Sequence, residues 1–70
     1  MRSITRATPD HRVAAGGAME ALIVEDSRTE RRLISRVLGN SGFNVTETGS
    51  AEDAKEKLAA GPPPDLMVVD

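Results

Sequence analysis

Three short segments typical of strands alternate with two segments of helical periodicity between residues 20 and 70. Two of the strand segments are apolar runs, 20–24 (EALIV) and 66–69 (LMVV), and the third, 43–48 (FNVTET), alternates and contains β-branched residues. The helical segments span 28–38 and 51–60. Strands and helices that alternate along one chain imply right-handed crossovers and a parallel sheet. We therefore expect an α/β fold in which a βαβαβ unit forms one small domain over residues 19–70.

The first helical segment has clear boundary signals. Ser27 followed three residues later by Glu30 is a capping box, and Gly42 is the expected left-handed residue after the helix. Apolar and basic side chains repeat every 3.6 residues on opposite faces, with Leu33, Ile34, Val37 and Leu38 against Arg28, Arg31, Arg32 and Arg36. We expect the apolar face to pack on the sheet and the four arginines to face solvent.

Residues 1–18 show neither helical nor strand periodicity. Pro9 and the pair Gly16-Gly17 interrupt any regular element. We interpret this segment as a disordered tail, or as the result of an incorrectly assigned start, with Met19 as the true initiator. His11 lies in it and is expected to be exposed to solvent.

The composition excludes several classes of function. The chain has no Cys and a single His, so a zinc site of the usual kind is not expected. One aromatic residue and a net charge of −2 argue against direct nucleic acid binding. No apolar run approaches the roughly 18 residues that span a bilayer, and no secretory signal is present, so we expect no membrane association and a cytoplasmic location.

Acidic side chains stand at the ends of two predicted strands. Glu25 and Asp26 follow the first strand, and Asp70 follows the third. Ligands of open α/β sheets bind at the carboxyl ends of strands, so these carboxylates converge if the two strands are neighbours. Close carboxylates repel one another unless a hard cation such as magnesium joins them. The pattern predicts a centre for magnesium-assisted phosphoryl transfer.

Four segments together resemble the receiver domains of two-component response regulators. They are ALIVEDS at 21–27, the Gly42-Phe43 turn, GSAEDAKEKL at 49–58 and PDLMVVD at 64–70. The resemblance implies an incomplete flavodoxin-like, doubly wound parallel sheet with three strands in the order 2-1-3. It also implies that Glu25, Asp26 and Asp70 bind Mg2+.

The same resemblance implies a function as a phosphoryl acceptor in a phosphorelay, not as an enzyme. Asp70 would accept the phosphoryl group from a phosphohistidine of a sensor histidine kinase or a histidine phosphotransfer protein. The first helix of this family often contributes to the surface that docks the kinase. The family also uses a hydroxyl residue after its fourth strand and a Lys after its fifth, and neither stands within these 70 residues. Residues 19–70 are therefore interpreted as a truncated receiver domain, inactive alone, whose third strand would have an open apolar edge.

Two other classes of function, a magnesium-dependent enzyme and a protein-binding module, stay open at this stage and give three alternatives. A Toprim-like enzyme would need an Asp-x-Asp pair at the later strand, and a haloacid-dehalogenase phosphatase would need one after the first strand. A pseudo-receiver that binds proteins without being phosphorylated is the third alternative, and the intact Glu25, Asp26 and Asp70 argue against it.

Overall fold

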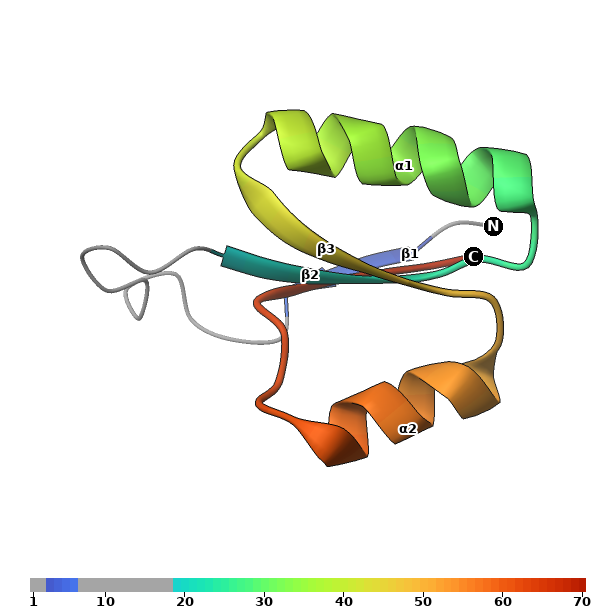
Figure 1. Cartoon of the computed structure of the whole chain (residues 1–70), viewed down its shortest axis with the longest axis vertical. Helices are drawn as coiled ribbons and strands as arrows, with labels where there is room; N and C mark the ends of the chain where they lie inside the picture. Colours follow the sequence, from blue (N-terminus) through green and yellow to red (C-terminus); the bar gives the residue numbers. More distant parts are fainter. Residues whose placement is uncertain (1–2, 7–18) are drawn as a thin grey trace.

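The computed structural model describes residues 3–6 and 19–70 and shows one sheet with a helix on each face (Figure 1). The sheet has four strands in the order β1-β4-β2-β3. The elements along the chain are β1 (Ser3–Arg6), β2 (Met19–Val24), α1 (Arg28–Asn40), β3 (Phe43–Thr48), α2 (Ala51–Ala60) and β4 (Leu66–Val69). The α/β class and the alternation of strands and helices over residues 19–70 are thus as expected.

Strand β2 is at the centre of the core. It pairs in parallel with β3 on one side and with β4 on the other, in registers that match Ile23 with Glu47 and with Val68. Ala21, Leu22 and Ile23 are all buried, because α1 and α2 cover opposite faces of this strand. A continuous apolar run is what a strand covered on both faces requires.

Strand β1 makes the sheet different from the expected three-stranded parallel one. It comes from the segment for which no regular element was expected, and it pairs antiparallel with β4, so that Ser3 is opposite Val69 and Arg6 is opposite Leu66. The sheet is therefore mixed and has four strands. The physical reason is that an open strand edge presents unpaired backbone N–H and C=O groups, which any extended segment within reach can satisfy. The rest of the expected tail, residues 1–2 and 7–18 with His11, lies outside the described residues.

Helix α1 begins where the sequence predicts and ends at Asn40, two residues beyond the expected segment. The Ser27 hydroxyl accepts a hydrogen bond of 3.3 Å from the backbone N–H of Glu30, which is the expected cap. Gly42 has a φ of 97°, the left-handed conformation that glycine adopts without a steric penalty.

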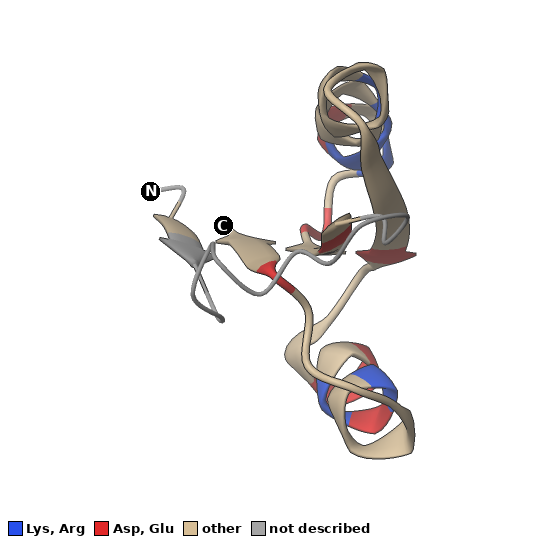
Figure 2. Cartoon of the chain, turned by 90° about the vertical axis from the view of Figure 1, so that its left-hand side faces the viewer, with Lys and Arg blue, Asp and Glu red and all other residues tan. Residues whose placement is uncertain are grey.

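Only part of the apolar face of α1 is buried against the sheet. Ile34 and Leu38 are half-buried, whereas Leu33 and Val37 are 52% and 64% exposed. The expectation that all four pack on the sheet was therefore wrong for two of them. The reason is that α1 packs over β2 and β3, whereas β4 lies to the side of this helix (Figure 2).

Helix α2 covers the opposite face of the sheet. Its cap is Ser50, whose hydroxyl accepts a hydrogen bond of 3.1 Å from the backbone N–H of Asp53. Ala54 is buried and Leu58 half-buried against the sheet. Neither helix that the structure describes is long and apolar enough to cross a lipid bilayer.

Candidate functional site

The carboxyl ends of β2 and β4 lie side by side. Val24 is paired with Val69, and the backbone N–H of Asp70 donates a hydrogen bond of 3.1 Å to the carbonyl oxygen of Val24. Asp70 therefore leaves β4 at the point where Glu25 and Asp26 leave β2. The structure brings the backbones of the three predicted site residues to one edge of the sheet.

Glu25 lies below the surface at this edge. It is 2% exposed, and its backbone N–H donates to the carbonyl oxygen of Thr48, at the end of β3, over 3.1 Å. Its Oε2 accepts a hydrogen bond of 3.0 Å from the backbone N–H of Ser27, the N-cap of α1. This carboxylate therefore helps to order the turn from β2 into α1.

Asp26 and Asp70 are the two exposed carboxylates of the edge. Among residues 3–6 and 19–70, no group of three or more His, Cys, Asp or Glu side chains is placed to hold a metal ion. The expected convergence of three carboxylate side chains is therefore not formed within the described residues. For Glu25, the physical reason is that its carboxylate points toward the backbone N–H of Ser27 and accepts a hydrogen bond from it.

Arg31 is a residue of this edge that sequence reasoning placed wrongly. It was expected on the solvent face of α1, but its Nη1 donates a hydrogen bond of 2.8 Å to the carbonyl oxygen of Glu25. Its Nε lies 3.5 Å from Oε1 of Glu47, on β3. Arg31 therefore joins α1 to the ends of β2 and β3. The signal that would have found it is its spacing of three and seven residues before Ile34 and Leu38, which puts all three on one helical face.

Thr48 holds the same edge from β3, and the sequence did not single it out. It is 1% exposed, and its hydroxyl donates a hydrogen bond of 2.6 Å to the carbonyl oxygen of Ile23. A threonine at a strand end is too common for its position alone to predict this role. Together with Arg31, it fixes the backbone from which Glu25 and Asp26 project.

Asp65 is acidic and buried but lies at the amino ends of β2 and β4, opposite the ends that carry Glu25, Asp26 and Asp70. Its Oδ2 accepts a hydrogen bond of 2.8 Å from the backbone N–H of Glu20, and its own N–H donates over 2.8 Å to the carbonyl oxygen of Glu20. This reciprocal pair sets the register of β4 against β2. Asp65 is therefore a structural residue at the amino end of the strands.

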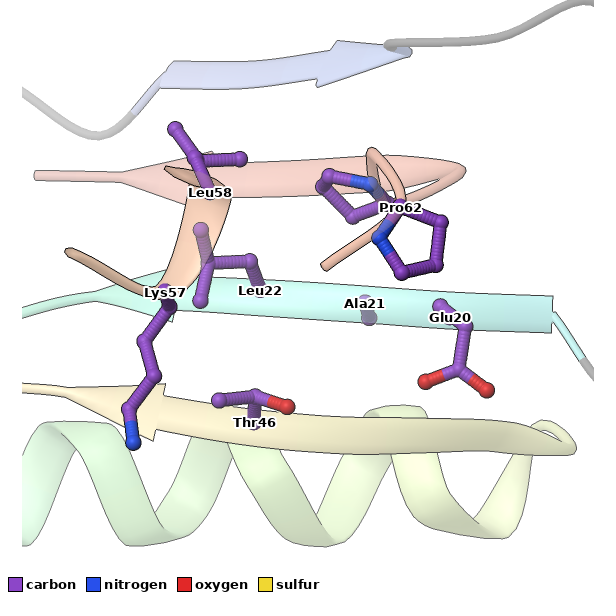
Figure 3. A pocket seen from close by; sticks show the side chains of 8 residues that line it. Glu20, Ala21, Leu22, Thr46, Lys57, Leu58 and Pro62 are labelled. Carbon is purple, nitrogen blue, oxygen red and sulfur yellow. The ribbon is translucent and has the colours of Figure 1, made fainter. Parts of the chain in front are cut away.

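A hollow of about 290 Å³ lies between α2 and the sheet (Figure 3). Leu22, Thr46 and Leu58 form its wall, with the side chains of Glu20 and Lys57 at opposite ends. None of Glu25, Asp26 and Asp70 lines it. The hollow is thus separate from the carboxylate edge, which stays the candidate site.

Comparison with known proteins supports the resemblance seen in the sequence. No protein-family model and no solved structure matches this chain. It is 38% identical over 58 residues to the two-component response regulator ORR5 of Oryza sativa subsp. japonica, and equally so to ORR5 of subsp. indica. The aligned residues are 83% of this chain and 43% of each rice protein. The chain thus spans less than half the length of these curated relatives, and over that part it is similar to a two-component response regulator.

Proposed function

We propose that residues 19–70 are the first part of a receiver domain that accepts a phosphoryl group on Asp70 in a two-component phosphorelay. The observation that carries this proposal is the hydrogen bond from Asp70 N–H to the carbonyl oxygen of Val24, which sets Asp70 beside Glu25 and Asp26. The similarity to a response regulator over 58 residues of this chain supports the proposal. That similarity does not favour a Toprim-like enzyme, a phosphatase or a pseudo-receiver.

Asp70 acts as the nucleophile in the proposed reaction. Its exposure lets a phosphohistidine approach its side chain, and its backbone is held by Val24. A carboxylate oxygen of Asp70 attacks the phosphorus atom, and the P–N bond to the imidazole breaks. The electron pair of that bond returns to the imidazole nitrogen, which then takes up a proton. The product is an acyl phosphate on Asp70.

The oxygen donors at the edge fit a magnesium ion. Asp26 and Asp70 are exposed carboxylates that follow neighbouring strands, and magnesium prefers one or two carboxylates together with water and phosphate oxygens. We propose that these two residues bind it directly and that Glu25 contributes through water. Magnesium, when bound, offsets the negative charge of the carboxylates and of the transferred group.

The proposed partner is a sensor histidine kinase or a histidine phosphotransfer protein. Arg28, Arg32 and Arg36 line a shallow depression of about 430 Å³ on α1, together with Thr29 and Leu33. In Figure 2, the Lys and Arg positions of α1 are coloured blue along its ribbon. A partner with acidic groups would complement these basic side chains. A phosphorelay of this kind is expected in the cytoplasm, and this segment is not proposed to bind nucleic acid or to act as an enzyme.

A polypeptide of these 70 residues alone is expected to accept little phosphate. The resemblance implies that a hydroxyl group and a Lys from later strands complete the site, and the rice relatives are more than twice as long as the aligned part. Without a Lys at this edge, the incoming phosphoryl group would meet Glu25, Asp26 and Asp70, and only magnesium and Arg31, which is bound to the Glu25 carbonyl oxygen, would offset their charge.

The proposal is tested by phosphorylating the full-length protein that contains residues 1–70. The protein is incubated with magnesium and phosphoramidate, a small P–N phosphodonor, and its intact mass is measured. We expect one added phosphoryl group that hydroxylamine removes, and none in Asp70→Asn. Asp53→Asn, an exchange of the same kind on α2, is the matched control and should be labelled normally. Equal labelling of Asp70→Asn and of the unmodified protein would contradict the proposal.

A further inference from the structure

The guanidinium group of Arg31 connects three segments at the carboxyl ends of β2 and β3. Its Nη1 donates a hydrogen bond of 2.8 Å to the carbonyl oxygen of Glu25, and its Nε lies 3.5 Å from Oε1 of Glu47. A Cβ added to Gly49, in the turn from β3 into α2, would lie 3.2 Å from Nη1. The Arg31 side chain is only 20% exposed, so protein groups surround most of it. The cluster lies on the side of β2 that faces β3, away from β4.

The hydrogen bond to Glu25 acts on the peptide that precedes Asp26. A peptide unit is planar, so the carbonyl of Glu25 and the N–H of Asp26 belong to one rigid plane. Thr48 and Ser27 also hold Glu25, but Thr48 binds its N–H and Ser27 binds its carboxylate. Of these three contacts, only the one with Arg31 holds the plane from which the backbone of Asp26 continues.

Asp26 lies where its conformation matters for a ligand. It stands in the turn between Val24, the last residue of β2, and Ser27, the N-cap of α1, and its side chain is exposed. A residue that a ligand must order at the moment of binding lowers the affinity, whereas one that is already held in place does not. The affinity of a cation for Asp26 therefore depends on what fixes the preceding peptide.

We propose that Arg31 is a positioning residue of the magnesium site, which holds the peptide between Glu25 and Asp26 so that Asp26 is preorganised for the cation. Glu47 fixes the Nε end of the guanidinium, and Gly49 leaves room for Nη1. This inference rests on the proposed function, because the magnesium ion belongs to that function. The charge of Arg31 has the opposite effect, since a positive group near a cation site repels the cation.

Magnesium binding without a phosphodonor tests this role, by isothermal titration of the full-length protein that contains residues 1–70. We expect Arg31→Met to bind magnesium severalfold more weakly than the unmodified protein. Arg32→Met, the matched control, removes the same charge from an exposed position of the same helix and should not weaken binding. Loss of a positive charge alone would strengthen binding, so the sign of the change separates positioning from charge. Arg31→Lys keeps the charge but lacks the planar fork, so its affinity should be intermediate.

Gly49→Ala tests the same contact with Arg31 still present. The new Cβ must displace the guanidinium by a few tenths of an ångström, so magnesium binding should weaken, but less than in Arg31→Met. In a chain that already carries Arg31→Met, the same exchange should have no further effect, because there is no guanidinium to displace. Gly61→Ala is the matched control, since a Cβ there meets nothing within 4 Å. This variant also provides the test if Arg31→Met does not fold.

The rate of phosphorylation by phosphoramidate supplies a second measurement. With Arg31→Met it should approach the rate of the unmodified protein once magnesium is saturating, because the backbone of Asp70 is held by β2 and not by Arg31. The inference is overturned if this rate stays low at saturating magnesium. It is equally overturned if Arg31→Met and Arg32→Met bind magnesium with the same affinity, or if Gly49→Ala weakens binding as much without Arg31 as with it.

Failure of the proposed function gives a different result. An unmodified protein that binds no magnesium and gains no phosphoryl group on Asp70 would overturn the proposed function and this inference together. An unmodified protein that does both, while the Arg31 and Gly49 variants behave like their controls, would overturn this inference alone.

Discussion

The backbone N–H of Asp70 donates a hydrogen bond of 3.1 Å to the carbonyl oxygen of Val24 and so continues the β2–β4 pairing to the end of the sheet. This bond fixes the backbone of Asp70 beside Glu25 and Asp26 but leaves its side chain exposed. Backbone pairing of this kind positions a nucleophile without burying it. The roles of the carboxylates can therefore be tested by changing side chains that the sheet does not need.

Asp26→Asn is expected to weaken magnesium binding and to lower phosphorylation by the phosphodonor. The exchange keeps the size of the exposed side chain and removes the negative charge that a hard cation prefers. Magnesium affinity is measured by isothermal titration on the longest protein that contains this chain, with Asp53→Asn as the control. Unchanged affinity and unchanged phosphorylation would remove Asp26 from the site.

Arg31→Met is expected to lower the free energy of unfolding by about 2 kcal/mol, because a half-buried charged hydrogen bond to the Glu25 carbonyl is lost. The ion pair with Glu47 contributes little to this figure, since partly exposed pairs are worth less than about 1 kcal/mol. Arg32→Met, one residue further along the same helix and exposed, is the matched control. Urea denaturation of both variants measures the difference, and equal midpoints would mean that Arg31 does not anchor the edge.

The sequence was sufficient to predict the elements of residues 19–70 because their signals are local. Ser27 with Glu30, Ser50 with Asp53 and Gly42 mark helix ends through groups only a few residues apart. The two apolar runs and the alternating segment 43–48 likewise predict their own strands. The site residues stand at strand ends, so their shared edge follows from parallel pairing.

Features that depend on distant contacts could not be predicted in this way. Strand β1 pairs with residues 60 to 66 positions away, and four residues such as SITR carry no pattern of their own. The inward turn of Glu25 depends on the N-cap N–H it meets, and the placement of Arg31 depends on where α1 crosses the sheet. Neither the type of a residue nor the helical periodicity of the sequence predicts these contacts of Glu25 and Arg31.

Two glycines near the end of α1 should respond to alanine in opposite directions. Gly42→Ala is expected to destabilise the protein by about 1 kcal/mol, because Gly42 has a φ of 97° that a Cβ disfavours. Gly39→Ala lies inside the helix with nothing within 4 Å of a new Cβ, so it should stabilise by up to about 1 kcal/mol. Thermal denaturation of both variants checks the pair. A shift of the midpoint in the same direction for both would contradict the helix end seen here.

The two central apolar residues of α1 should differ sharply although they are neighbours in sequence. Ile34 is half-buried against the sheet, and Leu33 is 52% exposed beside a hollow of about 350 Å³ that Ile4, Val37 and Val68 also line. Ile34→Gln buries a polar amide and loses apolar contact, so it should lower the free energy of unfolding by about 2–3 kcal/mol. Leu33→Gln should change it by less than about 0.5 kcal/mol, because exposed positions contribute little to the core. Urea denaturation at matched protein concentration compares the two variants. If Leu33→Gln were as damaging as Ile34→Gln, then α1 would lie further over β4 than the structure places it.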